Sequence, residues 1–354
     1  MSFHSRCLVV ATLLLGGPAS ALEVQTGDNG HVQNPVFSPD GKWLAFEINN
    51  LSNTVELWIA KFNSGSATGA RQLKIPGASS SFGGGGGFAA APEWLPPSQM
   101  VFFEGANPGG NLRIYYAAPT GGAPAEFIPS NTLQGNLTAP TIAEDGSQFA
   151  FVSDSTGKGD IYLWNLSGGG APSTVSPSSN SENFPAFDAT GKNIAFSRKQ
   201  DGSEDVFHWS EGGGGGVLKG GAGDQTRPVW AGGQVVYFSS ERGTGTWDIA
   251  VASPGGGGRR VIARGVKLPS RAAPALTPDQ GGVVWVSSDP EKADRVMVTG
   301  LDGSGTKQIS TGLVAVAEPS VVSVNGRVFM AFTALPAEGA DWRRLQLVDI
   351  TGKL

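Results

Sequence analysis

The sequence is poor in the residues that most often carry chemistry or cross-links. Its 354 residues include one cysteine, Cys7, and three histidines. A disulfide framework or a cysteine-based metal site needs several cysteines, so the sequence excludes both. It also contains no HExxH motif, which is the histidine-based zinc site of metalloproteases. It also has no G-x-S-x-G sequence and no Gly-Lys followed by Ser or Thr, so no nucleophile elbow or phosphate loop is indicated. We expect neither a metal nor a cofactor.

Positive charge is also scarce. The chain has 25 Lys and Arg residues against 30 Asp and Glu residues, which gives a formal net charge of -5. Binding to nucleic acid or to an anionic membrane requires a basic surface. The charge balance therefore argues against both as partners.

Long hydrophobic runs are missing as well. The apolar stretch from Cys7 to Leu15 follows Arg6, precedes small residues at Ala19 and Ala21, and is too short to span a bilayer. This pattern is typical of a secretory signal peptide over residues 1–21 that is cleaved after Ala21. We expect a periplasmic or secreted protein without a transmembrane segment, whose mature chain has no cysteine.

Glycine and proline are abundant, at 53 and 23 residues, and seven of the prolines recur at intervals of 43 to 57 residues. Each begins a phrase with an apolar triplet or quartet about ten residues downstream, such as PVFSPDGKWLAF and PAFDATGKNIAF. The seven prolines are Pro35, Pro92, Pro140, Pro185, Pro228, Pro274 and Pro319. A period in the forties that contains several short strands is the mark of a β-propeller.

Each repeat predicts four strands. We expect the proline at the start of the first strand and place the second strand at the apolar run, for example Phe149 to Val152. This run is apolar on both faces, as a strand between two neighbouring sheets requires. The sequence thus predicts an all-β fold, a single seven-bladed propeller over residues 22–354 with four-stranded antiparallel blades; a six-bladed ring is the alternative.

The ends of the chain predict how the ring closes. The seventh repeat stops after its third strand, near Ile350, whereas Leu22 to Thr26 stand where the fourth strand of a repeat belongs. An open sheet edge is a liability that closed propellers avoid. We expect the amino-terminal strand to complete the carboxy-terminal blade.

The repeats resemble those of TolB-like β-propellers. The phrase from Phe37 to Lys42, followed by Leu44-Ala45-Phe46, carries the likeness, and its echoes follow Pro140, Pro185 and Pro274. The resemblance implies a propeller fold and binding of a protein partner at the propeller mouth. The best-known member of the family has a separate amino-terminal α/β domain, for which we expect no room in this chain.

We define the mouth as the face on which the segments before the seven prolines and the loops between second and third strands should meet. The arginines are the strongest candidates because they make forked contacts with carboxylates. A long insertion before Pro92 adds two phenylalanines, which would anchor a loop that orders on binding or, in the alternative, belong to a disordered decoration. The candidate partner-binding residues are His31, Gln33, Phe82, Phe88, Asp224, Arg227, Arg271 and Glu318.

The leading hypothesis is a noncatalytic, exported scaffold of the cell envelope that binds a protein or ligand through this mouth. No catalytic residue is assigned. The alternative is a propeller enzyme, a hydrolase or lyase that acts on a saccharide, because propellers host such sites with residues from several blades.

Overall fold

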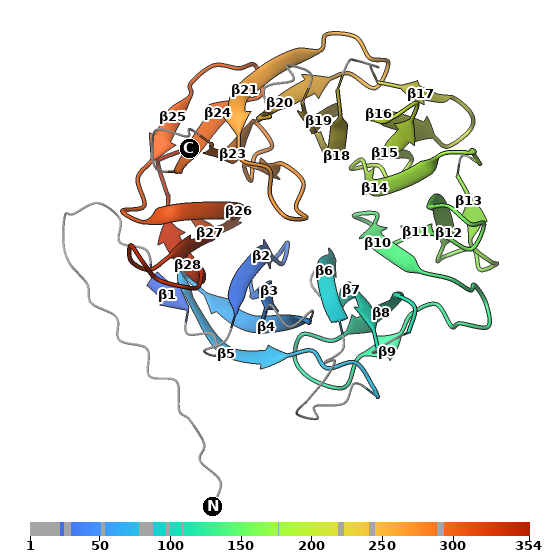
Figure 1. Ribbon diagram of the computed structural model, residues 1–354, viewed down its shortest axis with the longest axis horizontal. Helices are drawn as coiled ribbons and strands as arrows, with labels where there is room; N and C mark the ends of the chain where they lie inside the picture. The colour runs from blue at the N-terminus through green and yellow to red at the C-terminus, as the bar shows by residue number, and fades with distance from the viewer. Residues whose placement is uncertain are drawn as a thin grey trace, which may run out of the picture.

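The described part of the chain consists of strands and their connections. The computed structural model describes residues 22–24, 30–50, 54–77, 88–96, 100–107, 110–175, 177–218, 223–240, 245–288 and 294–354. All regular secondary structure in these ranges is β-strand. Figure 1 shows the sheets set around a central opening, with one edge of each toward the centre. The prediction of an all-β propeller built from four-stranded antiparallel sheets is confirmed at this level.

Four of the four-stranded sheets follow the chain from the inner strand outward. Their strands, in order of pairing within the described residues, are β2 (His31–Phe37), β3 (Trp43–Asn49), β4 (Val55–Asn63) and β5 (Ser66–Gln72); β6 (Phe88–Leu95), β7 (Met100–Ala106), β8 (Arg113–Ala117) and β9 (Ala125–Glu126); β10 (Leu137–Ile142), β11 (Gln148–Ser153), β12 (Asp160–Asn165) and β13 (Ser173–Thr174); and β14 (Ser181–Phe187), β15 (Asn193–Gln200), β16 (Ser203–Ser210) and β17 (Gly215–Val217).

The rest of the strands form an eight-stranded sheet and a fifth four-stranded sheet. The eight-stranded sheet contains β18 (Gln225–Ala231), β19 (Gln234–Ser239), β20 (Trp247–Ala252), β21 (Arg260–Val266), β22 (Ala275–Leu276), β23 (Gly282–Ser287), β24 (Arg295–Gly300) and β25 (Lys307–Ile309). A single residue pair, Val266 with Ser287, joins β21 to β23. The four-stranded sheet has the order β1 (Leu22–Val24), β28 (Arg344–Asp349), β27 (Arg327–Leu335) and β26 (Val314–Val324).

The second strands are buried on both faces, as their composition predicts. On β3, Leu44 and Phe46 pack into one core cluster, whereas Ala45 between them packs into the next. Successive side chains of a strand point to opposite faces, so one apolar run contributes to two cores. This explains why these strands are continuously apolar rather than alternating.

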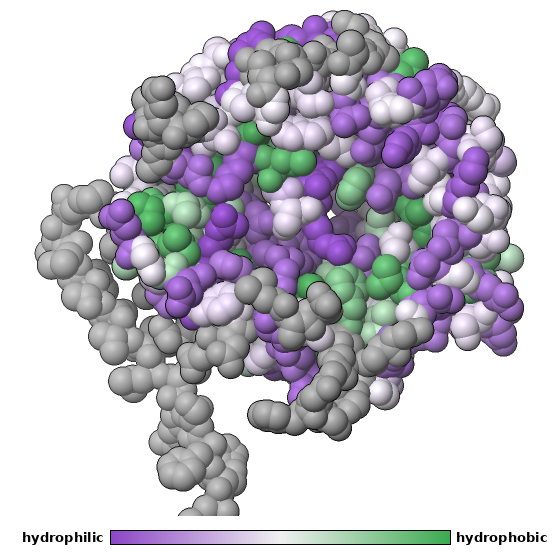
Figure 2. Space-filling model, viewed as in Figure 1, coloured by the Kyte–Doolittle hydropathy of each residue, from purple (hydrophilic) through white to green (hydrophobic). Residues whose placement is uncertain are grey.

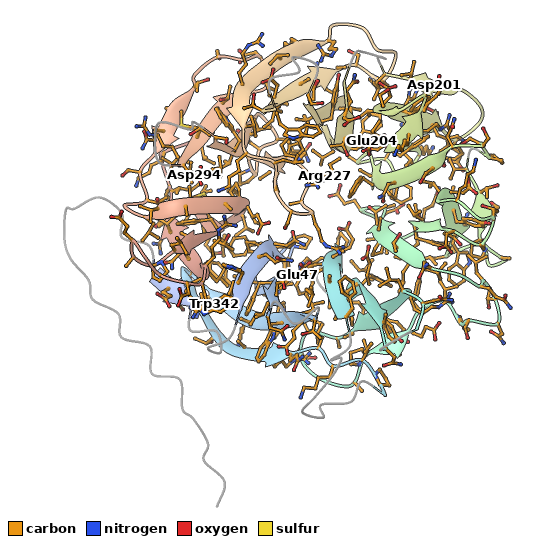
Figure 3. The ribbon with its side chains drawn as sticks, in the orientation of Figure 1. Glu47, Asp201, Glu204, Arg227, Asp294 and Trp342 are labelled. Atoms are coloured by element: carbon orange, nitrogen blue, oxygen red, sulfur yellow. The ribbon has the colours of Figure 1, made fainter. Side chains whose placement is uncertain are left out.

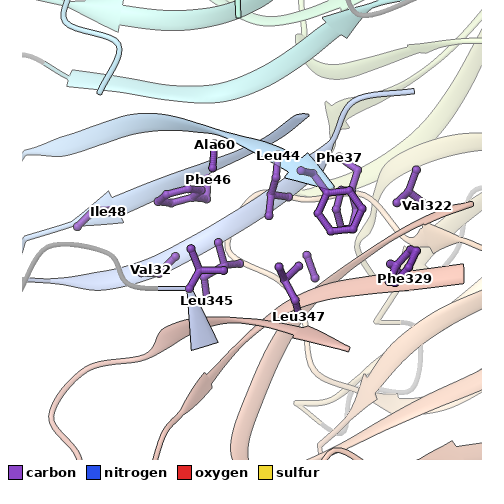
Figure 4. Close-up of a cluster of buried hydrophobic side chains, with 13 residues drawn as sticks. Val32, Phe37, Leu44, Phe46, Ile48, Ala60, Val322, Phe329, Leu345 and Leu347 are labelled. Atoms are coloured by element: carbon purple, nitrogen blue, oxygen red, sulfur yellow. The ribbon is translucent and has the colours of Figure 1, made fainter. Parts of the chain in front are cut away.

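The core is divided into clusters that lie between neighbouring sheets. Figure 4 shows the cluster between β2 to β4 and the sheet of β26 to β28, in which Phe37, Phe46 and Phe329 are buried. Phe62 contacts the rings of both Phe37 and Phe329, with centroids 4.9 and 5.3 Å apart. Seven such clusters exist among the described residues, and burial of their apolar surface is the main term that holds the sheets together.

The first described strand pairs with the last. Leu22 lies opposite Leu347, and Val24 lies opposite Leu345, in an antiparallel arrangement. Val24 is 5% exposed and belongs to the cluster of Figure 4. Residues 1–21, which include the predicted signal peptide and its cleavage site, lie outside the described residues. In the described ranges the protein has no helix that could serve as a membrane span.

The position of the prolines corrects one expectation. In six repeats the proline lies within the inner strand rather than at its start, at a break in the register of pairing with the second strand. Only Pro274 directly precedes its strand, β22. A bulge leaves one residue outside the ladder, so a proline there removes no ladder hydrogen bond.

The residue before the proline has a left-handed backbone in the same six repeats, with φ between 47° and 55°. These residues are Asn34, Ala91, Ala139, Phe184, Arg227 and Glu318. Such a backbone costs about 1 kcal/mol or more for a residue other than glycine, so surrounding contacts must stabilise it. The bulge turns the N–H group of this residue out of the ladder, where side chains from a neighbouring sheet accept its hydrogen bond in four of the six repeats.

Candidate functional site

The inner strands surround a central cavity of about 800 Å³. Six of the seven repeated prolines line it, and Pro274 lines an adjoining cavity of about 200 Å³. Figure 2 shows that the middle of the viewed face is hollowed and mostly hydrophilic. The central cavity lies within the size range of ligand sites in proteins.

Buried glutamates bind the backbone N–H groups that the bulges release. Glu47 on β3 accepts from Ala91 at 2.8 Å, Glu104 on β7 accepts from Ala139 at 2.7 Å, and Glu318 on β26 accepts from Asn34 at 2.7 Å. Each bond joins one sheet to the next around the ring. These glutamates therefore fix the shape of the cavity wall.

Glu47 has the most complete set of partners. It is fully buried, and its carboxylate accepts from Gln33 Nε2 at 2.8 Å and from Asn34 Nδ2 at 2.9 Å in addition to Ala91. Burial raises the pKa of Glu47 above its ordinary value, although these hydrogen bonds and the charge of Arg271 oppose the rise. Gln33, a predicted site residue, thus serves here as a donor to a buried carboxyl.

The segment of residues 267–274, which we call the strap, reaches from the end of β21 into the middle of the ring (Figure 1). Ser270 of the strap donates its N–H to Glu318 at 3.0 Å. The guanidinium of Arg227 donates to the backbone oxygens of Pro269, Ser270 and Ala272. Figure 3 labels Arg227 and Glu47 near the central opening, on sheets far apart in the sequence.

Arg271 ties the strap to the sheet of β6 to β9. Its Nη1 lies 3.0 Å from Glu104 Oε2, and its guanidinium lies over the ring of Phe88 at 5.2 Å from the centroid. The structure therefore brings four predicted site residues, Phe88, Arg227, Arg271 and Glu318, to the strap and the cavity around it. Both arginines are engaged by groups of the protein itself.

His31 lines a separate cavity of about 330 Å³, between the strap and the sheet of β26 to β28. Its Nδ1 accepts the N–H of Arg343 at 3.1 Å, and its ring meets Trp342 edge-on at 5.0 Å; Figure 3 labels Trp342. Burial, with the charges of Arg343 and Arg344, lowers the pKa of His31. The lowered pKa favours the neutral imidazole, whose Nδ1 accepts the hydrogen bond.

Asp224, another predicted site residue, does not join this group. Asp224 accepts the N–H of Glu204 at 2.9 Å and donates its own N–H to Ser240 at 2.9 Å, and it is not among the residues that line the central cavity. Phe82 lies outside the described residues. Within the part of the chain that is described, no three His, Cys, Asp or Glu side chains gather as metal ligands.

Sequence reasoning missed Glu93, which follows Pro92 on β6. Its half-buried side chain lines the central cavity and accepts hydrogen bonds from Thr141 Oγ1, at 3.4 Å, and from the N–H of Ile142. Burial raises the pKa of Glu93 from 4.5 to about 7. The signal in the sequence is the residue after the repeated proline, which is charged only at Glu93.

Replacing Glu93 by glutamine is expected to change how stability depends on pH. The raised pKa means that folding favours the protonated carboxyl, a contribution that is present below pH 4.5 and lost as the pH rises through about 7. As the pH rises from 5 to 8, the free energy of unfolding of the Glu93→Gln variant should increase by about 1 to 2 kcal/mol relative to that of the natural chain. The open cavity screens part of the charge, so this change is smaller than the full pKa shift would give. Urea denaturation at both pH values measures the gain. Glu144→Gln, at an exposed turn, is the control; parallel pH profiles for the two variants would contradict the shift.

Comparisons with known proteins agree on the fold. No protein-family model matches the chain, and no curated protein sequence does. Among solved structures, TolB from Acinetobacter baumannii has a TM-score of 0.54 at 15% identity, with 82% of this chain and 66% of that chain covered. The likeness supports the resemblance to TolB-like β-propellers that the repeats indicate.

Enzymes share the same fold. A puromycin-hydrolyzing peptidase of Mycobacterium tuberculosis has a TM-score of 0.66 at 13% identity and covers 92% of this chain, which spans 53% of the peptidase. An oligogalacturonate lyase in complex with manganese has a TM-score of 0.61 at 15% identity, with 95% and 97% of the two chains covered. At such low identities the likeness extends to the propeller and not to an activity.

Proposed function

We propose that the protein is an exported, noncatalytic TolB-like scaffold that binds a protein or peptide partner at the mouth and central cavity of its propeller. The observation that carries the proposal is the strap: a stretch of the chain's own backbone occupies the centre of the ring and is bound there through its carbonyl oxygens, one N–H group and Arg271. A centre that holds a segment of polypeptide in this way presents the contacts that a partner's peptide needs.

The ring geometry completes the proposal. We infer seven blades, because the eight-stranded sheet divides at the single pair of Val266 with Ser287 into β18 to β21 and β22 to β25. Seven core clusters support this count. The pairing of β1 with β28 supplies the outer strand of the last blade and closes the ring. Residues 22–354 are then one domain, and residues 1–21 are the signal peptide that directs export to the periplasm or beyond.

Crosslinking in cells that export the protein tests this function. A photoreactive residue at Asn183, which is exposed and lines the cavity, should capture a partner that the same residue at Glu144 does not capture. Arg227→Ala combined with Arg271→Ala should reduce capture about tenfold or more, because the loss of charged contacts of this kind costs at least about 1.4 kcal/mol. Arg295→Ala combined with Arg327→Ala is the matched control.

Two results would overturn the proposal. One is equal recovery of every captured protein by the variant with Arg227→Ala and Arg271→Ala and by the control with Arg295→Ala and Arg327→Ala. The other is that the purified chain hydrolyses a saccharide or cleaves it by elimination, and that the variant with Arg227→Ala and Arg271→Ala loses this activity. That result would establish the enzyme alternative.

A further inference from the structure

The residue that follows the proline faces the cavity in every repeat, and all seven of these positions are described. Six of them are small or uncharged: Val36, Thr141, Ala186, Val229, Ala275 and Ser320. The seventh is Glu93. A single carboxyl in a ring of small and aliphatic side chains is a marked departure from the repeat, and the fold does not require it, since five of the six other repeats form the same bulge without a charge.

Glu93 has no charged partner in the described part of the chain. Among the described residues it forms no ion pair, and its hydrogen-bond donors are Thr141 and Ile142. The other charged groups that line the cavity are engaged: Arg271 pairs with Glu104, and Arg227 binds the strap. The titratable groups on the strands packed against β6 are His31 on β2, Glu47 on β3, Glu56 and Lys61 on β4 and Glu104 on β7. None of these bonds to Glu93.

We propose that the central cavity binds an alkylammonium group, with its charge against Glu93 and its aliphatic stem against Val36, Ala186 and Val229. A divalent metal ion would need several oxygen ligands, whereas four of the six other ring positions, Val36, Ala186, Val229 and Ala275, are aliphatic. An ammonium group on a hydrocarbon stem matches one carboxylate surrounded by such side chains, because the stem is buried while the charge is paired. The cavity of about 800 Å³ holds a group of this size with room to spare.

The ammonium group has two possible sources, a free amine or a lysine side chain of a bound peptide. The second rests on the proposed function; the first does not. In both cases the ligand meets the ionised carboxylate, so binding competes with protonation of Glu93. An alkylammonium keeps its charge up to about pH 10, so between pH 6 and pH 8 the ligand itself does not titrate.

An NMR titration with n-butylammonium chloride at constant ionic strength tests the site on the whole mature chain. The methyl signals of Val36 and Val229 should shift, with about tenfold tighter binding at pH 8 than at pH 6, because the ionised fraction of a carboxyl with a pKa of about 7 changes by that factor. Glu93→Gln should weaken binding at pH 8 about tenfold or more and abolish the pH dependence. Glu144→Gln should leave both unchanged, and n-butanol should not bind.

The proposal is overturned if butylammonium leaves the methyl signals unchanged, if its affinity in the natural chain is the same at both pH values, or if the folded Glu93→Gln variant binds it equally well. A lysine-containing pentapeptide and its norleucine counterpart identify the source. If the lysine peptide binds more tightly than butylammonium and the norleucine peptide does not bind, the ligand is a peptide. If butylammonium and the lysine peptide bind equally well, the ligand is a free amine. Failure of the crosslinking experiment alone would overturn the partner-binding function and leave this site standing.

Discussion

Replacement of Glu47 by alanine is expected to lower the free energy of unfolding by about 3 to 5 kcal/mol. The variant removes one buried carboxyl and leaves three donors, on Gln33, Asn34 and Ala91, without their acceptor. Unpaired donors in a buried site lose the hydrogen bonds they had with water in the unfolded chain, and this loss is the main cost. Urea denaturation at pH 7 measures the change.

Glu47→Gln is the matched variant. Glutamine has the same shape and keeps one acceptor oxygen, but its amide NH₂ group faces a donor, so we expect a cost of about 1 to 2 kcal/mol. An alanine variant within about 1 kcal/mol of the natural chain would show that water replaces the carboxyl. The links that Glu47 makes between β3 and β6 would then contribute little to the ring.

A chain that begins at Gly27 is expected to melt roughly 5 to 10 °C lower than a chain that begins at Leu22. The deletion removes β1, exposes Leu345 and Leu347 of the core cluster and leaves β28 as an open edge. The lost burial of Val24 and its neighbours, with the lost ladder hydrogen bonds, corresponds to about 3 to 5 kcal/mol.

Thermal unfolding followed by circular dichroism measures this effect. Removal of Lys353 and Leu354 at the other end is the control, because Leu354 is exposed and neither residue belongs to a strand. An unchanged transition in the Gly27 chain would show that β1 does not close the ring. Aggregation of the Gly27 chain through β28 would be a further sign of the edge that β1 covers.

Much of the fold can be predicted from the repeats. The apolar run from Phe149 to Val152 identifies β11 because a strand between two sheets must be apolar on both faces, and Phe149 and Ala150 do enter different clusters. The turn residues before each apolar run and the spacing of the prolines likewise place the strands of each sheet. These are local signals, and they hold wherever the ring places the repeat.

The bulges are not a local signal. Nothing in the sequence around Ala91 or Ala139 favours a left-handed backbone, and a proline that follows is usually read as the beginning of a strand. The conformation is stabilised by Glu47 and Glu104, which lie 44 and 35 residues earlier and reach the bulge from the preceding sheet. Only the packed ring brings these donors and acceptors together.

The site divides along the same line. The sequence by itself determined that the segments around the prolines meet at one face, because successive repeats of one structural unit place equivalent residues in equivalent positions. It also determined which residues carry charge there, including Arg227 and Arg271. Tertiary structure alone decided that Arg271 pairs with Glu104, 167 residues away, that Arg227 binds the strap, and that Glu93 forms no ion pair with any described residue. The physical reason is that an ion pair depends on distance in space, and those distances are set only when the sheets pack against one another.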